Sequence, residues 1–203
     1  MIRPNAPGWL IVLEGIDGAG KSTVVRRLVE YCTQRGLESV TSFEPTRGTW
    51  GQKLRQSMVE GRLSLEEELG LFLKDRAEHV AALINPAIER GAVIILDRYY
   101  FSTAAYQGAR GLDPRTIIEA NEKFSPIPNL VLLLDLDPTV GATRITRRGD
   151  VLDDFEGLDY QREVRRIFLS LKRPFIRRID ASQNVEAVFQ EARAITKQIL
   201  NPN

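Results

Sequence analysis

The feature that most constrains this sequence is a glycine-rich stretch between a short apolar run and a helical segment. The stretch reads Gly15-Ile16-Asp17-Gly18-Ala19-Gly20-Lys21-Ser22-Thr23. Residues 9–13 before it are apolar, and residues 22–35 after it have helical composition. A buried strand, a tight loop and a helix in this order are typical of the start of a layered α/β structure.

The rest of the chain continues this alternation of strands and helices. The predicted strands are residues 9–13, 39–43, 93–96, 130–134 and 178–180. The predicted helices are residues 22–35, 50–60, 65–90 and 185–200, and Pro86 is expected to kink or end the long one. Apolar strands without alternation are buried on both faces, as in parallel sheets. We therefore predict an α/β fold with a central, mostly parallel five-stranded sheet covered by helices on both faces.

The glycine-rich stretch matches G-x-x-x-x-G-K-[ST] in full and has the strand and helix that this motif requires. Its glycines let several backbone N–H groups point at one anion, and the following helix adds its positive end. Lys21 would supply a cation for the β- and γ-phosphates of ATP, and the Ser22 hydroxyl would be a ligand of Mg²⁺. A plain glycine turn is the alternative, while the glycine spacing is wrong for a dinucleotide site.

Composition narrows the class of protein. The 203 residues suit one domain, and a net charge of +1 gives no general field for nucleic acid. One cysteine, Cys32, and one histidine provide no disulfide and no zinc site. No signal peptide or membrane-length apolar run is present, so we expect a cytoplasmic protein that binds neither nucleic acid nor membrane.

Two further segments carry candidate binding residues. Phe72 and Arg76 are four residues apart on a predicted helix and so share a face, which suits a flat base with polar edges. The alternative is a core phenylalanine beside a solvated arginine. Asp97 and Arg98 follow a buried strand and are expected at the same edge of the sheet as the glycine-rich loop. The alternative there is an Asp–Arg pair that caps the next helix.

A third segment, residues 144–156, combines clustered arginines with a glycine and acidic residues. It is typical of a lid whose arginines meet phosphate on closing, and a solvated surface loop is the alternative. We predict one domain over residues 1–203 with a mobile lid at about residues 147–158.

Together these segments resemble the thymidylate kinases, from Leu10 to about Leu200. The motifs that carry the resemblance are the glycine-rich loop, Glu44-Pro45, Phe72 with Arg76 and His79, Asp97-Arg98-Tyr99, Ala105-Tyr106-Gln107-Gly108, Leu134-Asp135-Leu136-Asp137-Pro138 and Ile179-Asp180-Ala181-Ser182-Gln183. The resemblance implies the three-layer fold of the P-loop kinases. It also implies transfer of a phosphoryl group from ATP to dTMP, with Mg²⁺, in the synthesis of dTTP, and commonly a homodimer.

The resemblance also implies roles for single residues. For the acceptor, Phe72 would stack on thymine, Arg76 would reach a base carbonyl and Arg98 would hold the monophosphate. Asp17 would bind near the 3′-hydroxyl, Tyr106 would favour deoxyribose, and Pro45, Ser102, Thr103 and Gln107 would complete the site. Arg144, Ala181 and Ser182 would lie near the donor adenine. Asp97 would orient Arg98 or a metal-bound water.

The family places an arginine either in the glycine-rich loop or in the lid. Here the loop position is Gly18, so Arg147 or Arg148 of the lid would supply the charge, although residues 149–161 contain no arginine. Arg47 follows the Glu44-Pro45 turn where many relatives have glycines, and it is either a phosphate contact or a surface residue. The competing functions are another P-loop nucleoside or nucleotide kinase, and a nucleotide-binding regulator without turnover.

Overall fold

The computed structural model describes residues 8–61, 63–147 and 157–201. Its strands are β1 (Trp9–Glu14), β2 (Ser39–Phe43), β3 (Val93–Asp97), β4 (Leu130–Asp135) and β5 (Ile176–Asp180). They form a five-stranded sheet in the order β2-β3-β1-β4-β5. All the pairings between these strands are parallel. The predicted α/β fold with a mostly parallel five-stranded sheet is confirmed, and the sheet is parallel throughout the described strands.

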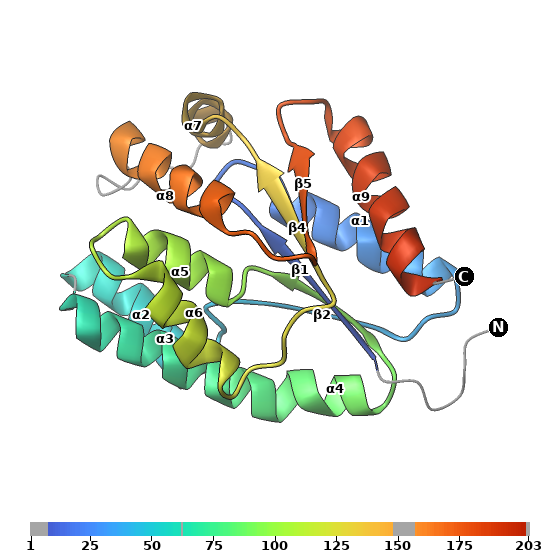
Figure 1. Cartoon of the computed structure of the whole chain (residues 1–203), viewed down its shortest axis with the longest axis horizontal. Helices are drawn as coiled ribbons and strands as arrows, with labels where there is room; N and C mark the ends of the chain where they lie inside the picture. The colour runs from blue at the N-terminus through green and yellow to red at the C-terminus, as the bar shows by residue number, and fades with distance from the viewer. Residues whose placement is uncertain (1–7, 62, 148–156, 202–203) are drawn as a thin grey trace.

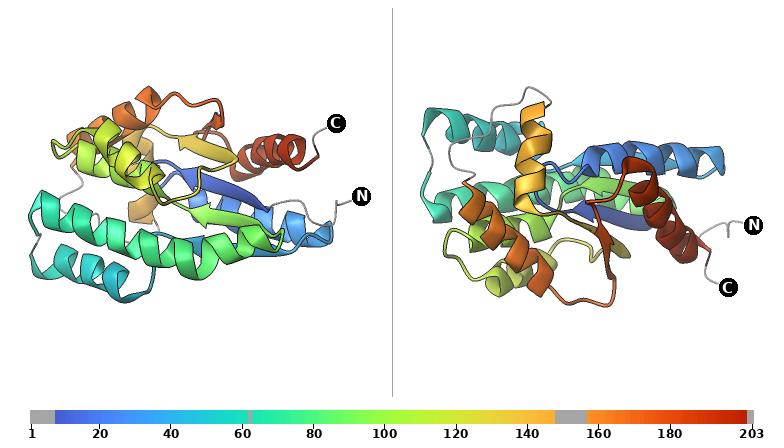
Figure 2. Two further views of the ribbon diagram at one scale, coloured as in Figure 1. Left: turned by 60° about the horizontal axis from the view of Figure 1, so that its bottom comes forward. Right: turned by 90° about the horizontal axis from the view of Figure 1, so that it is seen from above.

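The helices form a layer on each face of this sheet (Figures 1 and 2). They are α1 (Lys21–Gln34), α2 (Thr49–Glu60), α3 (Leu65–His79), α4 (Asn85–Glu89), α5 (Tyr100–Gly108), α6 (Pro114–Glu122), α7 (Pro138–Arg147), α8 (Leu158–Ser170) and α9 (Val185–Leu200). Helices α1 and α9 lie together on one face, and α3, α5, α6 and α8 lie on the other. No described helix has the length and apolar character needed to cross a membrane.

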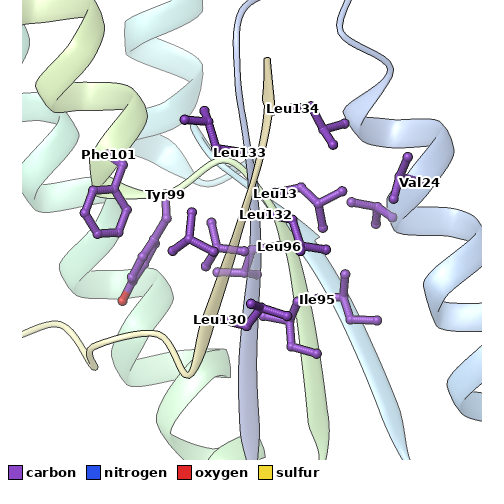
Figure 3. Close-up of a cluster of buried hydrophobic side chains, with 14 of the residues drawn as sticks. Leu13, Val24, Ile95, Leu96, Tyr99, Phe101, Leu130, Leu132, Leu133 and Leu134 are labelled. Atoms are coloured by element: carbon purple, nitrogen blue, oxygen red, sulfur yellow. The ribbon is translucent and has the colours of Figure 1, made fainter. Parts of the chain in front are cut away.

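The core follows from the apolar strand runs. Residues of β1, β3 and β4 are almost all buried, whereas the edge strands β2 and β5 are partly exposed. Figure 3 shows the consequence on β4, where Leu133 and Leu134 point to opposite faces of the sheet. Cys32 lies in this core, and burial raises the pKa of its thiol to about 11.

The long predicted helix does not end at Pro86. After α3 the chain makes a π-helical turn, η1 (Val80–Ile84), and continues into α4 with Pro86 in its first turn. The Asn85 N–H donates to the Val80 carbonyl, which is the five-residue step of a π turn. This wider turn ends just before the proline, whose nitrogen cannot donate a helical hydrogen bond.

The topology brings the expected functional segments to one edge of the sheet. The glycine-rich loop leaves β1, and Arg98 leaves the neighbouring strand β3, both at their carboxyl ends. Helix α7, which follows β4, lies across the same edge (Figure 2, right). In open α/β sheets this edge is where ligands bind.

Candidate active site

The glycine-rich loop is built from residues with a left-handed backbone. Gly15, Gly18 and Gly20 have φ of 136°, 80° and 91°. A Cβ at Gly15 would collide with the Leu134 carbonyl oxygen, so this loop passes directly over β4. The loop can therefore curl closely over the sheet only with glycine at these positions.

Lys21 begins α1 and is buried, with 6% of its surface exposed. Its Nζ donates to the carbonyls of Gly15 and Ile16 at 3.0 and 2.9 Å. Burial, helped by the nearby Arg98 charge, lowers the pKa of Lys21 to about 8, and Asp17 only partly offsets this. The ammonium group is thus held over the loop, where a phosphate bound by the loop would meet it.

Ser22 and Asp97 come together from different elements. The Ser22 Oγ, at the start of α1, donates to the Asp97 Oδ2 at the end of β3, at 2.5 Å. A hydroxyl and a carboxylate side by side are oxygen ligands of the kind that Mg²⁺ accepts beside phosphate oxygens. Asp97 thus bonds Ser22, and its expected role of orienting Arg98 or a metal-bound water stays a prediction.

Arg98 connects the glycine-rich loop to α5. It is the one described residue other than glycine with a positive φ, 71°. Its Nη2 donates to Asp17 Oδ1 at 2.5 Å and to the Tyr106 hydroxyl at 3.3 Å, and its Nη1 donates to the Ser102 Oγ at 3.1 Å. Burial opposes the charge on Asp17, yet Arg98 and Lys21 outweigh it and hold the pKa of Asp17 well below its usual range.

Glu14 lies beneath this cluster and was missed in the sequence, because it closes an apolar run and looked like a strand end. It is buried, and its carboxyl group accepts from the N–H groups of Tyr99 and Ser102 at 2.9 and 3.2 Å. The Ser102 Oγ donates to it at 2.5 Å. Burial raises the pKa of Glu14 to about 7. Glu14 therefore caps α5, the task that the sequence had offered to an Asp97–Arg98 pair.

A cavity of about 250 Å³ opens beside Arg98. The structure places on its wall every residue expected to bind the acceptor: Asp17, Pro45, Phe72, Arg76, Arg98, Ser102, Thr103, Tyr106 and Gln107. These come from the glycine-rich loop, the β2–α2 turn, α3, the β3–α5 turn and α5. Glu44, Met58, Glu68, Tyr99 and Tyr160 line it as well. No local pattern indicated Met58, Glu68 or Tyr160, which reach the cavity only through tertiary packing.

Arg76 lies at one end of this cavity in a buried network. Its Nε donates to the Glu44 Oε2 at 2.8 Å, and its Nη2 forms an ion pair with the same oxygen at 2.6 Å. Its Nη1 donates to the Asn121 Oδ1 at 2.5 Å, and its Nη2 donates to the Thr103 Oγ1 at 3.0 Å. His79 also bonds Glu44, at 2.9 Å. With 1% of its surface exposed, Arg76 is not the solvated arginine of the alternative interpretation.

The remaining polar groups of the cavity are also paired. The Gln107 Nε2 donates to Glu68 at 3.2 Å, and Arg110 forms an ion pair with the same buried carboxylate. Tyr160, on the first turn of α8, donates its hydroxyl to the Tyr106 carbonyl at 2.9 Å. The segment that follows the expected lid is therefore bonded to the wall of this cavity.

The residues expected near the donor base lie on the other side of the glycine-rich loop. Arg144 of α7 donates to the Ala181 carbonyl at 3.0 Å and to the Gly18 carbonyl at 3.4 Å. Ser182 is held in a turn by Asp180, which accepts from its N–H and its Oγ at 2.9 and 2.7 Å. Helix α7, the loop and the turn after β5 are joined here, although their role toward ATP stays a prediction.

Other expected residues lie apart from this assembly. Arg147 is exposed at the end of α7, and Arg148 and most of the predicted lid are outside the described residues. Arg47 is exposed with its guanidinium 5.6 Å from the Phe43 ring centroid, away from the cavity wall. Of its two interpretations, the surface residue is the one that fits.

Gly18 explains why this loop carries no arginine. A Cβ at Gly18 would lie 2.6 Å from the Gly141 carbonyl oxygen, and one at Gly141 would lie 2.7 Å from the Asp17 carbonyl oxygen. The loop and α7 therefore touch through two glycines. A side chain at residue 18 would push α7 away.

The chain is similar to known proteins over most of its length. The sequence model of the family described as Thymidylate kinase matches residues 13–192. A thymidylate kinase of Akkermansia muciniphila is 53% identical over 186 residues, covering 92% of this chain and 90% of that protein. Those of Desulfotalea psychrophila and Xylella fastidiosa are 48% and 49% identical, covering 97% and 95% of this chain and 98% and 88% of their own lengths. The chain therefore belongs to the thymidylate kinase family.

Proposed function

We propose that this protein is an ATP-dependent kinase that transfers the γ-phosphoryl group of ATP to dTMP, giving ADP and dTDP. The observation that carries the proposal is the junction at Arg98. This arginine lines the acceptor cavity and also contacts Asp17 and Gly15 of the phosphate loop. A monophosphate in the cavity and a triphosphate on the loop would thus meet across one arginine. The family membership supports the same reaction.

The chain's own residues would do little covalent chemistry. Phosphoryl transfer mainly needs two anionic substrates held in line with their repulsion neutralised. Lys21 would donate to the transferred phosphoryl group, and Arg98 to the acceptor phosphate. Both are held over the loop by carbonyl groups and by Asp17, so their positive charges lie close together before substrates bind. This preorganisation reduces the reorganisation needed during the reaction.

Mg²⁺ fits the oxygen pair formed by Ser22 and Asp97. These two residues would hold the ion, which would neutralise charge on the phosphate chain of ATP when bound. The lid arginines Arg147 and Arg148 complete the proposed machinery. A homodimer in the cytoplasm remains a prediction from the sequence and from its family resemblance.

The test is to incubate the protein with ATP, Mg²⁺ and each nucleoside or deoxynucleoside monophosphate, and to follow ADP. Strong ADP formation with dTMP, weaker with dUMP and near none with the others is expected. Turnover with another acceptor would keep the kinase and reject dTMP. ATP binding without acceptor-dependent ADP would favour the regulator without turnover.

A further inference from the structure

The turn between β2 and α2 forms one wall of the acceptor cavity through Pro45. The next residue, Thr46, is bonded twice to Asp75 of α3. The Thr46 N–H donates to the Asp75 Oδ2 at 2.7 Å, and the Thr46 Oγ1 donates to the Asp75 Oδ1 at 2.6 Å. The same Oγ1 accepts from the Gly48 N–H at 3.0 Å, so this hydroxyl shapes the turn as well as anchoring it.

Asp75 is a buried carboxylate on α3 without a cationic partner among the described residues. It is buried, with 3% of its surface exposed, and no described lysine, arginine or histidine forms an ion pair with it. A buried carboxylate without a cation is costly, so it is retained only where its hydrogen bonds matter. Both of its hydrogen bonds go to Thr46.

Helix α2 holds the same turn from the other side. Arg55 donates to the Thr46 carbonyl at 2.6 Å, to the Gly51 carbonyl at 3.1 Å and also to the Pro45 carbonyl. A Cβ at Gly51 would overlap the Thr46 carbonyl oxygen, so the turn is packed directly on α2. Thr46 thus lies between α2 and α3. Its contact with α2 uses its backbone carbonyl, whereas its contact with α3 includes a hydrogen bond between its own hydroxyl and the Asp75 carboxylate.

Two consecutive residues of α3 therefore bind the β2–α2 turn on either side of Pro45. Asp75 binds Thr46, and Arg76 binds Glu44, on either side of Pro45. Phe72, one turn earlier on α3, lines the cavity together with Pro45. The distance between these two apolar walls is set by the same helix that anchors the turn.

We propose that Thr46 and Asp75 are positioning residues that fix the Pro45 wall against α3 and so set the fit of the acceptor cavity to its nucleotide. The inference deepens the proposed function and depends on it. Fixing the wall before binding avoids an ordering cost when the acceptor enters. The contact should therefore affect the acceptor and leave ATP binding unchanged.

The experiment compares Thr46→Val, Thr46→Ser and Asp75→Asn with the wild type and with a control, Thr41→Val. Thr41 also uses its hydroxyl, donating to the Ile95 carbonyl at 3.1 Å, but it lies on β2 away from the cavity. Steady-state ADP formation gives the KM for dTMP and for ATP, and thermal unfolding gives stability. Thr46→Val and Asp75→Asn should raise the KM for dTMP roughly tenfold. The KM for ATP should stay unchanged, and Thr46→Ser should restore the wild-type value.

Three outcomes would contradict this. If Thr46→Val lowers the melting temperature as Thr41→Val does but keeps the wild-type KM for dTMP, the contact is structural only. If both KM values rise together, the contact does not act on the acceptor wall. A wild-type protein that makes no ADP with any monophosphate overturns the proposed function first, and the inference falls with it.

Discussion

Two arginines reach the acceptor cavity, and they are held in different ways. Arg76 has 1% of its side chain exposed and pairs with Glu44, which is 3% exposed. Arg98 has 17% exposed and pairs with Asp17, which is 39% exposed. Arg76 donates to three buried side chains on separate elements, whereas Arg98 donates to side chains and a carbonyl at the rim of the loop.

Under the proposed function, this difference separates recognition of the base by Arg76 from phosphate chemistry at Arg98. A fully paired buried arginine has one geometry, which suits a group that must always read the same base edge. An arginine at the rim can exchange a partner such as Asp17 for a phosphate without leaving a carboxylate buried. The Arg76 end of the cavity is therefore rigid, and the Arg98 end keeps charge available; under the proposed function these are the base end and the phosphate end.

The largest effect is expected from removing the charge at the phosphate end. Arg98→Ala should lower kcat/KM for dTMP by about a thousandfold, as loss of a transition-state donor does. Its melting temperature should change little, because Asp17 remains partly solvated. Steady-state kinetics and thermal unfolding check both, and a large loss of stability would show that the two arginines are alike.

Removing the charge of Arg76 should instead cause a large loss of stability. Arg76→Met leaves Glu44 buried without its cation, so unfolding free energy should fall by about 3–5 kcal/mol. Urea denaturation measures this. The double variant Arg76→Met with Glu44→Gln should recover part of the loss, and an absence of recovery would show that Glu44 is not the reason.

Glu14, beneath the phosphate end, should impose a pH dependence on stability. Its folded pKa of about 7 lies above the ordinary 4.5, so the folded state holds a proton that the unfolded state has released between these values. The stability that Glu14 contributes is therefore lost as pH rises through this window, and the free energy of unfolding falls by about 3 kcal/mol. Between pH 4.5 and 8, the free energy of unfolding of Glu14→Gln should vary less with pH than that of the wild type. Parallel plots of this free energy against pH for the two proteins would contradict the prediction.

The smallest effect is expected at Asn121, which orients Arg76 from α6. Its Nδ2 donates to the Ile117 carbonyl at 2.7 Å, which turns its Oδ1 toward Arg76. Asn121→Ala should raise the KM for dTMP by about tenfold through loss of one charge-assisted bond. Asn129→Ala is the matched control, because Asn129 accepts from the Leu10 N–H far from the cavity. Equal KM values in the two variants would argue against the role of Asn121.

Much of this architecture could be predicted from local patterns. The apolar runs of β1, β3 and β4 predict a parallel sheet, and the glycine spacing predicts the phosphate loop. The four-residue spacing of Phe72 and Arg76 placed both on one face of α3. Of the two outcomes expected at Pro86, a kink or an end, the end is wrong, because a π turn just before the proline lets the chain continue into α4. The spacing of apolar residues in the sequence does not indicate this π turn.

The partners of the charged residues were beyond such patterns. Glu14 reads as the end of a strand, and Asp75 and Asn121 read as ordinary helix residues. Each meets its partner only when another element packs beside it. Glu14 is 85 residues from Tyr99, and Asn121 is 45 from Arg76.

The sequence by itself determined the α/β layers, the phosphate loop and the kinds of residue available for an acceptor. These depend on spacing within one element, where backbone geometry dictates which side chains share a face. Tertiary structure alone decided which carboxylate holds each cation, and hence that Arg76 is buried and locked while Arg98 stays at the rim. Burial and Coulomb energies depend on distances between elements, and those distances exist only in the folded chain.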